Sequence, residues 1–192
     1  MGCVADNSQQ KTNTTGDTPD AGAEFWSFSL AFYARPCAPA ALIALQDGAG
    51  CDANLILFAI WLGLSGRGQL DEHGASTADR ALQAIRDDVI EPLRVLRRRL
   101  KPAADADIQR LRQAIKALEI EAERAAQDRL ASLAGPASDG DPVQRLTDAK
   151  VNLALYLALR KVSGAQAAII ENELKRFAEE ALRPWQPVPP SA

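Results

Sequence analysis

The feature that most constrains the fold of this chain is a run of residues that is apolar on every side. Residues 55–64 read LILFAIWLGL and leave no polar face on a helix. A helix that is apolar all round is either a membrane span or the centre of a core. Ten helical residues reach about 15 Å, roughly half the hydrocarbon thickness of a bilayer. We therefore predict a central core helix and no membrane span.

The remaining composition favours helices packed around this run. The chain has 192 residues and 47% hydrophobic content, but only 5% aromatic residues. That length supports one core of ordinary size, and strand-forming residues are scarce. Elsewhere, apolar residues recur at steps of three and four, the spacing of one helix face. We predict an all-α fold, a single-domain bundle of six to eight helices.

The helical domain is expected to span residues 24–183, between two tails of different kinds. Residues 1–23 are polar and cannot offset their ordering entropy by burial, so they are predicted to be a disordered tail. Four prolines predict an extended tail over residues 184–192. Glycines, prolines and aspartates predict a linker at residues 135–142, followed by two helices that Ser163 and Gly164 separate into a hairpin.

Residues that favour helix ends divide the first half of the chain. Pro36 ends a first aromatic helix over residues 24–34, and a short helix follows it. Asp52 is well placed to cap the central helix. Ser76 and Asp79 form a plausible capping box for the next one.

Two long apolar stripes follow. The first runs from Ala78 to Leu100 through Pro92, which predicts one kinked helix or two collinear ones. The second predicts a long amphipathic helix over residues 106–133 that packs through one narrow seam. The seam has heptad-like spacing and comprises Ile108, Leu111, Ile115, Leu118, Ala122 and Ala125.

Charge and cysteine content exclude several classes of protein. The net charge of −3 argues against a general nucleic-acid binder, which would be basic overall. With one histidine and three cysteines (Cys3, Cys37 and Cys51), the chain lacks the residues of a zinc module or a disulfide framework. Reduced thiols and the lack of a secretory signal predict a cytoplasmic protein.

Three segments together resemble a known family. They are the stretch from Phe25-Trp26 to Trp61, the stretch VIEPLR with RRRLK at residues 89–101, and KALEIEAER at residues 116–124. This combination resembles a proteobacterial family described only as a domain of unknown function, number 2390. The resemblance covers roughly residues 24–133 and implies a bacterial, cytoplasmic, helical protein. It supplies no activity, substrate or catalytic residue.

Three polar residues bracket the turn before the central helix, namely Gln46, Asp47 and Asn54. In one interpretation, Asp47 and Asn54 bond backbone groups around the turn and cap the helix ends. In the other, the three polar groups orient a small ligand in a pocket. The aromatic residues that would line such a pocket are Trp26, Tyr33 and Trp61.

A basic stretch lies between Arg80 and Lys116, with ten Lys or Arg residues against five Asp or Glu. One helix face within it carries Arg94, Arg97, Arg98 and Lys101. This face is either solvated and paired along its own helix, as in Glu91 with Arg94, or bridged to the acidic residues 119–123. A third interpretation is a site for an anionic partner, either an acidic protein patch, a phosphate-bearing ligand or RNA. Few aromatic residues lie among the arginines, so base stacking is not indicated.

Catalytic and metal-binding signals are weak. Asp87 with Glu91, and Glu119 with Glu123, have the four-residue spacing of a magnesium motif, but their neighbours are bases. No serine or cysteine has an identifiable base. We therefore predict no catalytic residue, no metal site and no cofactor.

The leading hypothesis is a small non-enzymatic interaction or regulatory module that binds a protein or anionic partner through its basic face. The competing hypothesis is a small-molecule-binding or enzymatic pocket around Gln46, Asp47, Asn54 and Trp61. The sequence predicts no particular oligomeric state.

Overall fold

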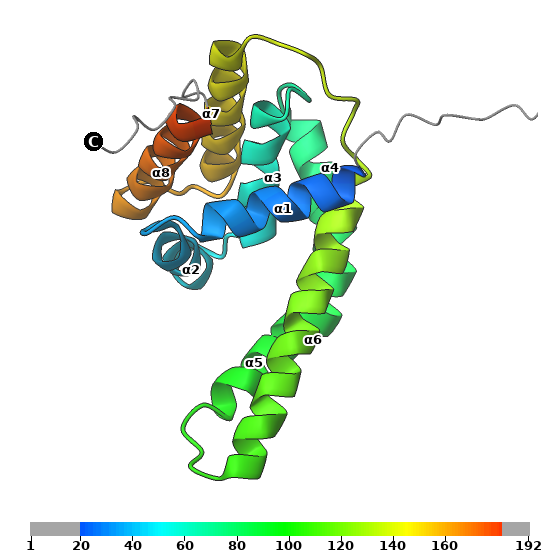
Figure 1. Cartoon of the computed structure of the whole chain (residues 1–192), viewed down its shortest axis with the longest axis vertical. Coiled ribbons are helices and arrows are strands. Elements are labelled where there is room, and N and C mark those ends of the chain that lie inside the picture. The colour runs from blue at the N-terminus through cyan, green and yellow to red at the C-terminus, as the bar shows by residue number, and fades with distance from the viewer. Residues whose placement is uncertain (1–19, 182–192) are drawn as a thin grey trace, which may run out of the picture.

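The computed structural model describes residues 20–181, and all regular elements among them are helical (Figure 1). This confirms the all-α prediction. The elements are α1 (Ala21–Tyr33), α2 (Ala38–Ala49), α3 (Ala53–Leu64), α4 (Glu72–Ile85), the π-helical turn η1 (Arg86–Ile90), α5 (Glu91–Arg99), α6 (Ala106–Ala131), α7 (Pro142–Leu159) and α8 (Ala165–Ala181).

Both predicted tails fall mainly outside the described residues. Of the segment predicted as a disordered tail, residues 1–19 lie outside, whereas residues 21–23 belong to α1. The helix begins earlier than predicted because Asp20 caps it, with its Oδ1 accepting a hydrogen bond from the Gly22 backbone N–H at 3.2 Å. The predicted extended tail at residues 184–192 lies wholly outside.

Helix α3 is the centre of the core, as predicted. Every residue from Ala53 to Gly63 is buried. Helix α7 runs along it so closely that a Cβ on Gly63 would lie 2.1 Å from the Ala149 backbone nitrogen, so only glycine fits there. The core cluster around α3 includes fully buried side chains from six other helices, among them Phe25, Leu42, Leu82, Leu130, Leu153 and Ile170.

Aspartates begin most of the helices. The Asp52, Asp105 and Asp141 side chains each accept a hydrogen bond from a backbone N–H two residues further on. The predicted capping box at Ser76 and Asp79 is wrong, because α4 begins at Glu72 and Asp71 caps it through the Gly74 N–H at 2.7 Å. Ser76 and Asp79 therefore lie inside α4.

Helices α4 and α5 are continuous through η1, so of the two predicted forms, one kinked helix or two collinear ones, the structure has one continuous helix through Pro92. Pro92 has no N–H to offer the carbonyl of Asp88. The turn before it is widened, so that the Glu91 N–H bonds the Arg86 carbonyl five residues back. The widened turn adds one residue to the helix without ending it.

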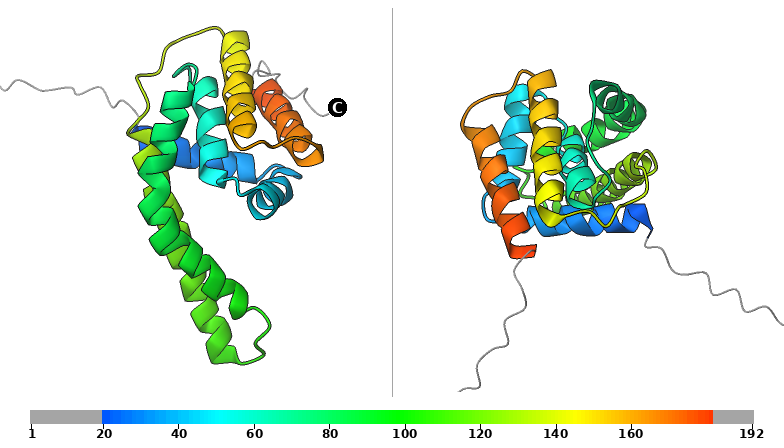
Figure 2. Two further views of the ribbon diagram at one scale, coloured as in Figure 1. Left: turned by 180° about the vertical axis from the view of Figure 1, so that it is seen from behind. Right: turned by 90° about the horizontal axis from the view of Figure 1, so that it is seen from above.

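The molecule has two parts of different shape (Figures 1 and 2). The body comprises α1 to α4, α7, α8 and the C-terminal end of α6. The arm comprises α5 and residues 106–123 of α6, which lie side by side and project away from the body. No residue of α5 is fully buried, and the arm's half of α6 buries only Glu119.

The predicted apolar seam of α6 is only partly right, because Ile108, Ile115 and Ala122 are half-buried whereas Leu111, Leu118 and Ala125 are exposed. Leu111 is 57% exposed and Leu118 is 52% exposed. The inward face also contains the half-buried Arg112 and the buried Glu119 and Ala126, each one residue after an exposed seam member. The apolar pattern identified only part of the inward face because Arg112 and Glu119 on that face are polar, and polar residues do not contribute to an apolar periodicity.

The C-terminal part follows the prediction closely. The connection between Ala131 and Pro142 contains the predicted linker, and the break at residues 163–164 separates α7 from α8. Helix α8 packs against α2 as well as α7. Among the described helices, none is long and apolar enough by itself to span a membrane, although α1 and α2 taken together, with a 100° bend between them, meet the length and composition.

Candidate functional site

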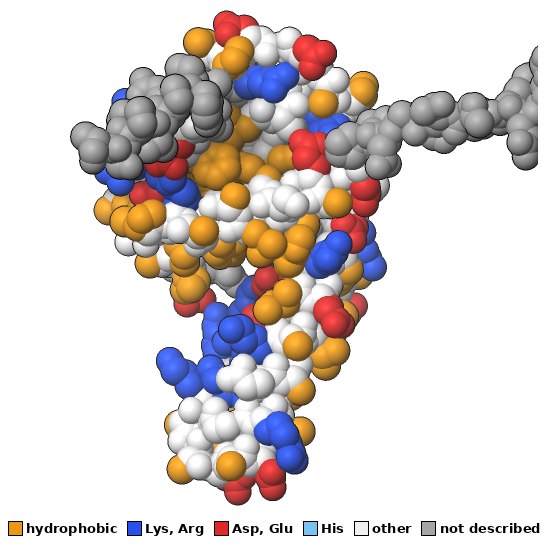
Figure 3. All heavy atoms as spheres, viewed as in Figure 1, with side chains coloured by type: hydrophobic (Ala, Val, Ile, Leu, Met, Phe, Trp, Pro, Cys, Tyr) orange, Lys and Arg blue, Asp and Glu red, His pale blue; other side chains and the backbone are white. Residues whose placement is uncertain are grey.

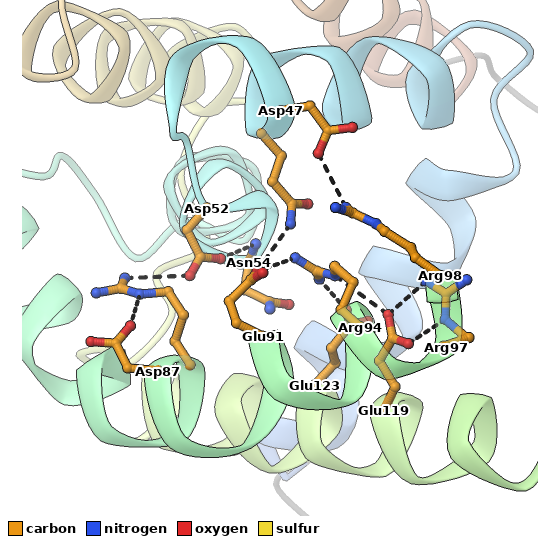
Figure 4. A network of polar contacts seen from close by, with 12 residues as sticks. Asp47, Asp52, Asn54, Asp87, Glu91, Arg94, Arg97, Arg98, Glu119 and Glu123 are labelled. Atoms are coloured by element: carbon orange, nitrogen blue, oxygen red, sulfur yellow. Dashed lines mark hydrogen bonds and ion pairs between the residues drawn. The ribbon is translucent and has the colours of Figure 1, made fainter. Parts of the chain in front are cut away.

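The junction of body and arm is built around Arg94 of α5, whose side chain is 11% exposed (Figure 4). Its Nη1 donates to Glu91 Oε1 at 2.6 Å and its Nη2 to Glu123 Oε1 at 2.9 Å. Its Nε donates to Glu119 Oε1 at 3.4 Å. Because both partners are ionised, such bonds are stronger than neutral ones. Arg94 therefore ties α5 to α6 at the root of the arm.

Glu119 is the second anchor of this cluster and is only 6% exposed. It accepts hydrogen bonds from the Nε of Arg97 and, at 3.0 Å, from the Arg97 Nη2. Burial alone would raise the pKa of Glu119, but the hydrogen bonds and charges of Arg97 and Arg94 outweigh it and lower the pKa. The carboxylate therefore stays ionised between the two arginines.

The structure divides the predicted basic face. Arg94 and Arg97 are engaged by carboxylates of α6, and Arg94 also pairs with Glu91 on its own helix. Arg98 is 51% exposed and reaches Asp47 of α2 at 3.1 Å. Lys101 is exposed and has no ion-pair partner within residues 20–181. Only the outer half of the predicted face is open to a partner.

Gln46, Asp47 and Asn54 lie near one another, as their positions in the sequence predicted, but their side chains do not bond the backbone of the turn. Asn54 is 6% exposed and its Oδ1 accepts from Gln127 Nε2 of α6 at 2.8 Å. The Gln46 Nε2 donates to Glu91 Oε1 at 3.4 Å. All three line a pocket of about 280 Å³ beneath the arm. Gly50, with a φ of 61°, ends α2 instead.

Trp61 does not belong to this pocket. Its side chain is 2% exposed, stacks on Phe25 at 4.9 Å between ring centroids and donates from Nε1 to Glu24 Oε1 at 3.2 Å. It lines a different hollow, on the side of the body near Phe28. Trp61 lies seven residues beyond Asn54 in α3, which is about 10 Å along the helix axis. The predicted grouping of Trp61 with the polar trio is therefore wrong.

Arginines hold the carboxylates that resembled a metal motif. Asp87 bonds Arg86 Nε at 3.1 Å, and Glu91 bonds Arg94. Arg86 also reaches Asp52, where burial raises the pKa of the carboxyl although Arg86 and the Asn54 N–H oppose it. In the described part of the chain, no group of three or more His, Cys, Asp or Glu side chains is placed to hold a metal ion.

A larger groove of about 600 Å³ lies between α1 and α2 of the body and the arm. We call it the basic groove. Figure 3 shows Lys and Arg side chains gathered on the arm just below the body, where the surface is hollowed. Its cations are Arg94, Arg97, Arg98, Lys101, Arg112 and Lys116, and its carboxylates are Asp47, Glu119 and Glu123. Its apolar and aromatic wall comprises Trp26, Leu30, Tyr33, Ile43 and Ile120.

Several polar atoms of the basic groove lack a partner. Ser29 Oγ, Arg112 Nε and Gln127 Oε1 are buried and make no hydrogen bond within the described residues. Leaving a buried polar group unsatisfied costs about 1–3 kcal/mol, so such atoms mark places where a ligand group gains by binding. All three residues line the basic groove.

Sequence reasoning found part of this groove. The basic stretch included Arg112 and Lys116, and the aromatic residues Trp26 and Tyr33 were expected beside Gln46. The polar residues Ser29 and Gln127 carried no signal, because only the crossing of α1 over α6 places them in one groove.

The comparisons identify a family without a described function. A family model described as "Protein of unknown function (DUF2390)" matches residues 24–130, more than half of the chain. No curated protein and no solved structure matches the chain. The match includes α1 to α5 and nearly all of α6, so it contains the whole of the basic groove.

Proposed function

Because the chain belongs to the DUF2390 family, whose function is unknown, we propose a function from the basic groove itself. The protein is a non-enzymatic binding module that takes an acidic segment of a partner protein between its body and its arm. This proposal keeps the leading hypothesis from the sequence and moves the site from one helix face to a groove.

The observation that carries the proposal is a surplus of uncompensated cations in the groove. Six cations line it against three carboxylates, and those carboxylates pair with Arg94, Arg97 and Arg98. Lys101, Arg112 and Lys116 have no ion-pair partner among residues 20–181. A groove lined by charge of one sign concentrates and orients partners of the opposite sign.

The other wall of the groove supports a protein segment rather than a nucleic acid. Leu30 and Ile43 are 55% and 54% exposed there, which favours apolar side chains on the partner. A phosphate polymer gains most from a basic surface with few carboxylates. This groove keeps Asp47 and Glu123 on its lining, and the chain as a whole has a net charge of −3.

An enzymatic role has less support. Burial raises the pKa of the Cys51 thiol, which makes it a poor nucleophile at neutral pH. The competing pocket around Gln46, Asp47 and Asn54 offers few free polar groups, because the side chains of all three already bond protein partners.

The test is a selection of random peptides of about 15 residues on the immobilised full chain. We expect enrichment of peptides that combine Asp or Glu with Leu, Ile or Phe. Selected peptides should bind at least about tenfold more weakly to the double variant Lys101→Glu, Lys116→Glu, because reversal of rim charges removes attraction and adds repulsion. Fluorescence anisotropy measures the binding, and circular dichroism checks that the melting temperature is unchanged.

A matched control uses two exposed lysines away from the groove. Lys150→Glu with Lys175→Glu makes the same change in net charge on α7 and α8. Peptide binding to this control should equal that of the unmodified chain. Selection of basic or purely apolar peptides, or equal loss of binding in both double variants, would overturn the proposal.

A further inference from the structure

The side of the arm that faces away from the basic groove carries a row of apolar side chains on α6. Each residue advances about 100° around a helix. Lys116, Ile120 and Glu123 line the groove, which places Leu111 and Leu118 on the opposite flank. These two leucines are 57% and 52% exposed. The exposed apolar residues of α6 on this flank are Leu111, Ala114, Leu118 and Ala125, and the half-buried Ile115 and Ala122 border it on the side of the core.

Helix α5 extends the same flank. Arg94, Arg98 and Lys101 line the groove, so helical spacing places Leu96 on the opposite side of α5, with the half-buried Leu93 and Leu100 beside it. Leu96 is 44% exposed. In Figure 3, hydrophobic side chains along the right edge of the arm are interspersed with charged ones and lie apart from the main cluster of Lys and Arg. A two-helix layer with one uncovered apolar flank is half of a four-helix bundle.

The row on α6 is complementary in size to its own reverse. With Leu118 placed opposite Leu118 of a second, antiparallel copy, Leu111 lies level with Ala125. The large Leu111 of each copy therefore meets the small Ala125 of the other on both sides of the central leucines, which is how facing helices interdigitate.

The charges of the row are complementary in the same register. Asp107 and Arg129 lie on this flank, and each is eleven residues from Leu118. Both are exposed; Asp107 also pairs with Arg110 at 3.1 Å, an exposed contact of little energy. The antiparallel register that pairs Leu111 with Ala125 therefore places Asp107 of each copy opposite Arg129 of the other.

We propose that two copies of this chain associate through this flank, antiparallel, around a two-fold axis at Leu118. The pair forms a four-helix layer from two arms. This inference is independent of the proposed function, because the basic groove lies on the other side of the arm and stays open in the dimer.

The first test is sedimentation velocity of the full chain at about 100 µM, above the micromolar Kd of weak specific interfaces. We expect a dimer. The double variant Leu111→Asp, Leu118→Asp should sediment as a monomer with an unchanged helical circular-dichroism spectrum. The groove variant Lys101→Glu, Lys116→Glu should remain a dimer, and the leucine variant should retain peptide binding, which separates the two proposals.

The second test checks the register. With Cys3 and Cys37 replaced by serine, Leu118→Cys should be cross-linked between copies by a short bismaleimide, because both cysteines lie at the axis. Leu111→Cys is the matched control. In the proposed register, two such cysteines are fourteen residues apart along the axis, about 21 Å, and should not be cross-linked.

The third test uses charge. Asp107→Arg alone, or Arg129→Asp alone, should weaken the dimer about tenfold by placing like charges together. The double variant Asp107→Arg, Arg129→Asp should restore it. A monomeric full chain at about 100 µM would overturn the proposal, and would indicate that another segment or another protein covers the flank. A dimer unaffected by the leucine substitutions would overturn it as well.

Discussion

The body and the arm are both built of packed helices, but different forces hold them. In the body, α3 is buried from Ala53 to Gly63 in a core to which six other helices contribute apolar side chains. In the arm, α5 meets α6 through Arg94, Arg97 and Glu119, and Glu119 is the only fully buried residue among residues 106–123 of α6. Apolar burial therefore holds the helices of the body together, and ion pairs provide much of the contact between the helices of the arm.

This difference has a physical consequence. Hydrophobic burial is non-directional and depends little on pH, whereas a desolvated ion pair requires defined geometry and ionised partners. Regions with few buried apolar contacts also open locally at lower free energy than the core. The arm is therefore expected to respond to substitutions and to pH that leave the body unchanged.

The largest expected effect is in the body. Leu57→Ala removes a fully buried side chain of α3 and should lower the free energy of unfolding by about 3 kcal/mol, because it leaves a cavity in the core. Urea denaturation followed by circular dichroism measures it. Val95→Ala on the arm, where the side chain is 48% exposed, should change stability by less than about 0.5 kcal/mol. Similar losses of stability in both variants would contradict the distinction between a body held by apolar burial and an arm held largely by ion pairs.

The next effect should be confined to the arm. Glu119→Ala leaves Arg94 and Arg97 without their shared carboxylate, which should cost about 2 kcal/mol in local stability. Hydrogen exchange should become faster in α5 and in residues 106–123, while the amides of α3 keep their protection. The exposed Glu121 provides the control, since Glu121→Ala should change neither region. Equal acceleration in α3 would show that body and arm unfold together.

The response to pH should distinguish two glutamates of the arm. Interactions with Arg97 and Arg94 lower the pKa of Glu119, so its stabilising contribution is complete above the ordinary value of 4.5 and is lost as pH falls through the lower folded value. Burial raises the pKa of Glu123, so its contribution has the opposite sign and is lost as pH rises above 4.5. Arm stability should therefore be highest near pH 4.5.

Hydrogen exchange of the arm at several pH values tests this expectation. Glu119→Gln should abolish the decline on the acid side of the maximum, and Glu123→Gln should abolish the decline on the other side. Each variant removes one titrating group without changing the size of the side chain. An arm whose stability is independent of pH between 3 and 7 in the unmodified chain would remove ion pairing as its main support.

The smallest expected effect is at the contact of the arm with α2. Arg98 and Asp47 are both about half exposed, so Asp47→Asn should change the free energy of unfolding by less than about 0.5 kcal/mol. The same change releases Arg98 into the basic groove. Selected acidic peptides should bind a few times more tightly in fluorescence anisotropy, and weaker binding would show that Asp47 positions Arg98 for the partner.

The same contrast explains what the sequence could and could not predict. The apolar run of α3 and the cap at Asp52 were predictable, because burial and capping leave local patterns. The inward face of α6 was not fully predictable, because the polar residues Arg112 and Glu119 occupy part of it. The inward position of Glu119 is explained only by the fold, which places Arg97 opposite it. The basic groove joins α1 and α2 to α5 and α6, and Trp61 was misplaced because chain proximity to Asn54 does not imply a shared pocket.

The widened turn at Arg86–Ile90 determines in which direction each side chain of α5 points. Its one extra residue advances the downstream helix by about 100° relative to a regular α-helix. Deletion of a single residue there would rotate Arg94 and Arg97 away from Glu119 and turn the leucines of α5 toward a different neighbour. A family member that lacked the extra residue would therefore have to carry its arginines at shifted positions to reach the same carboxylate.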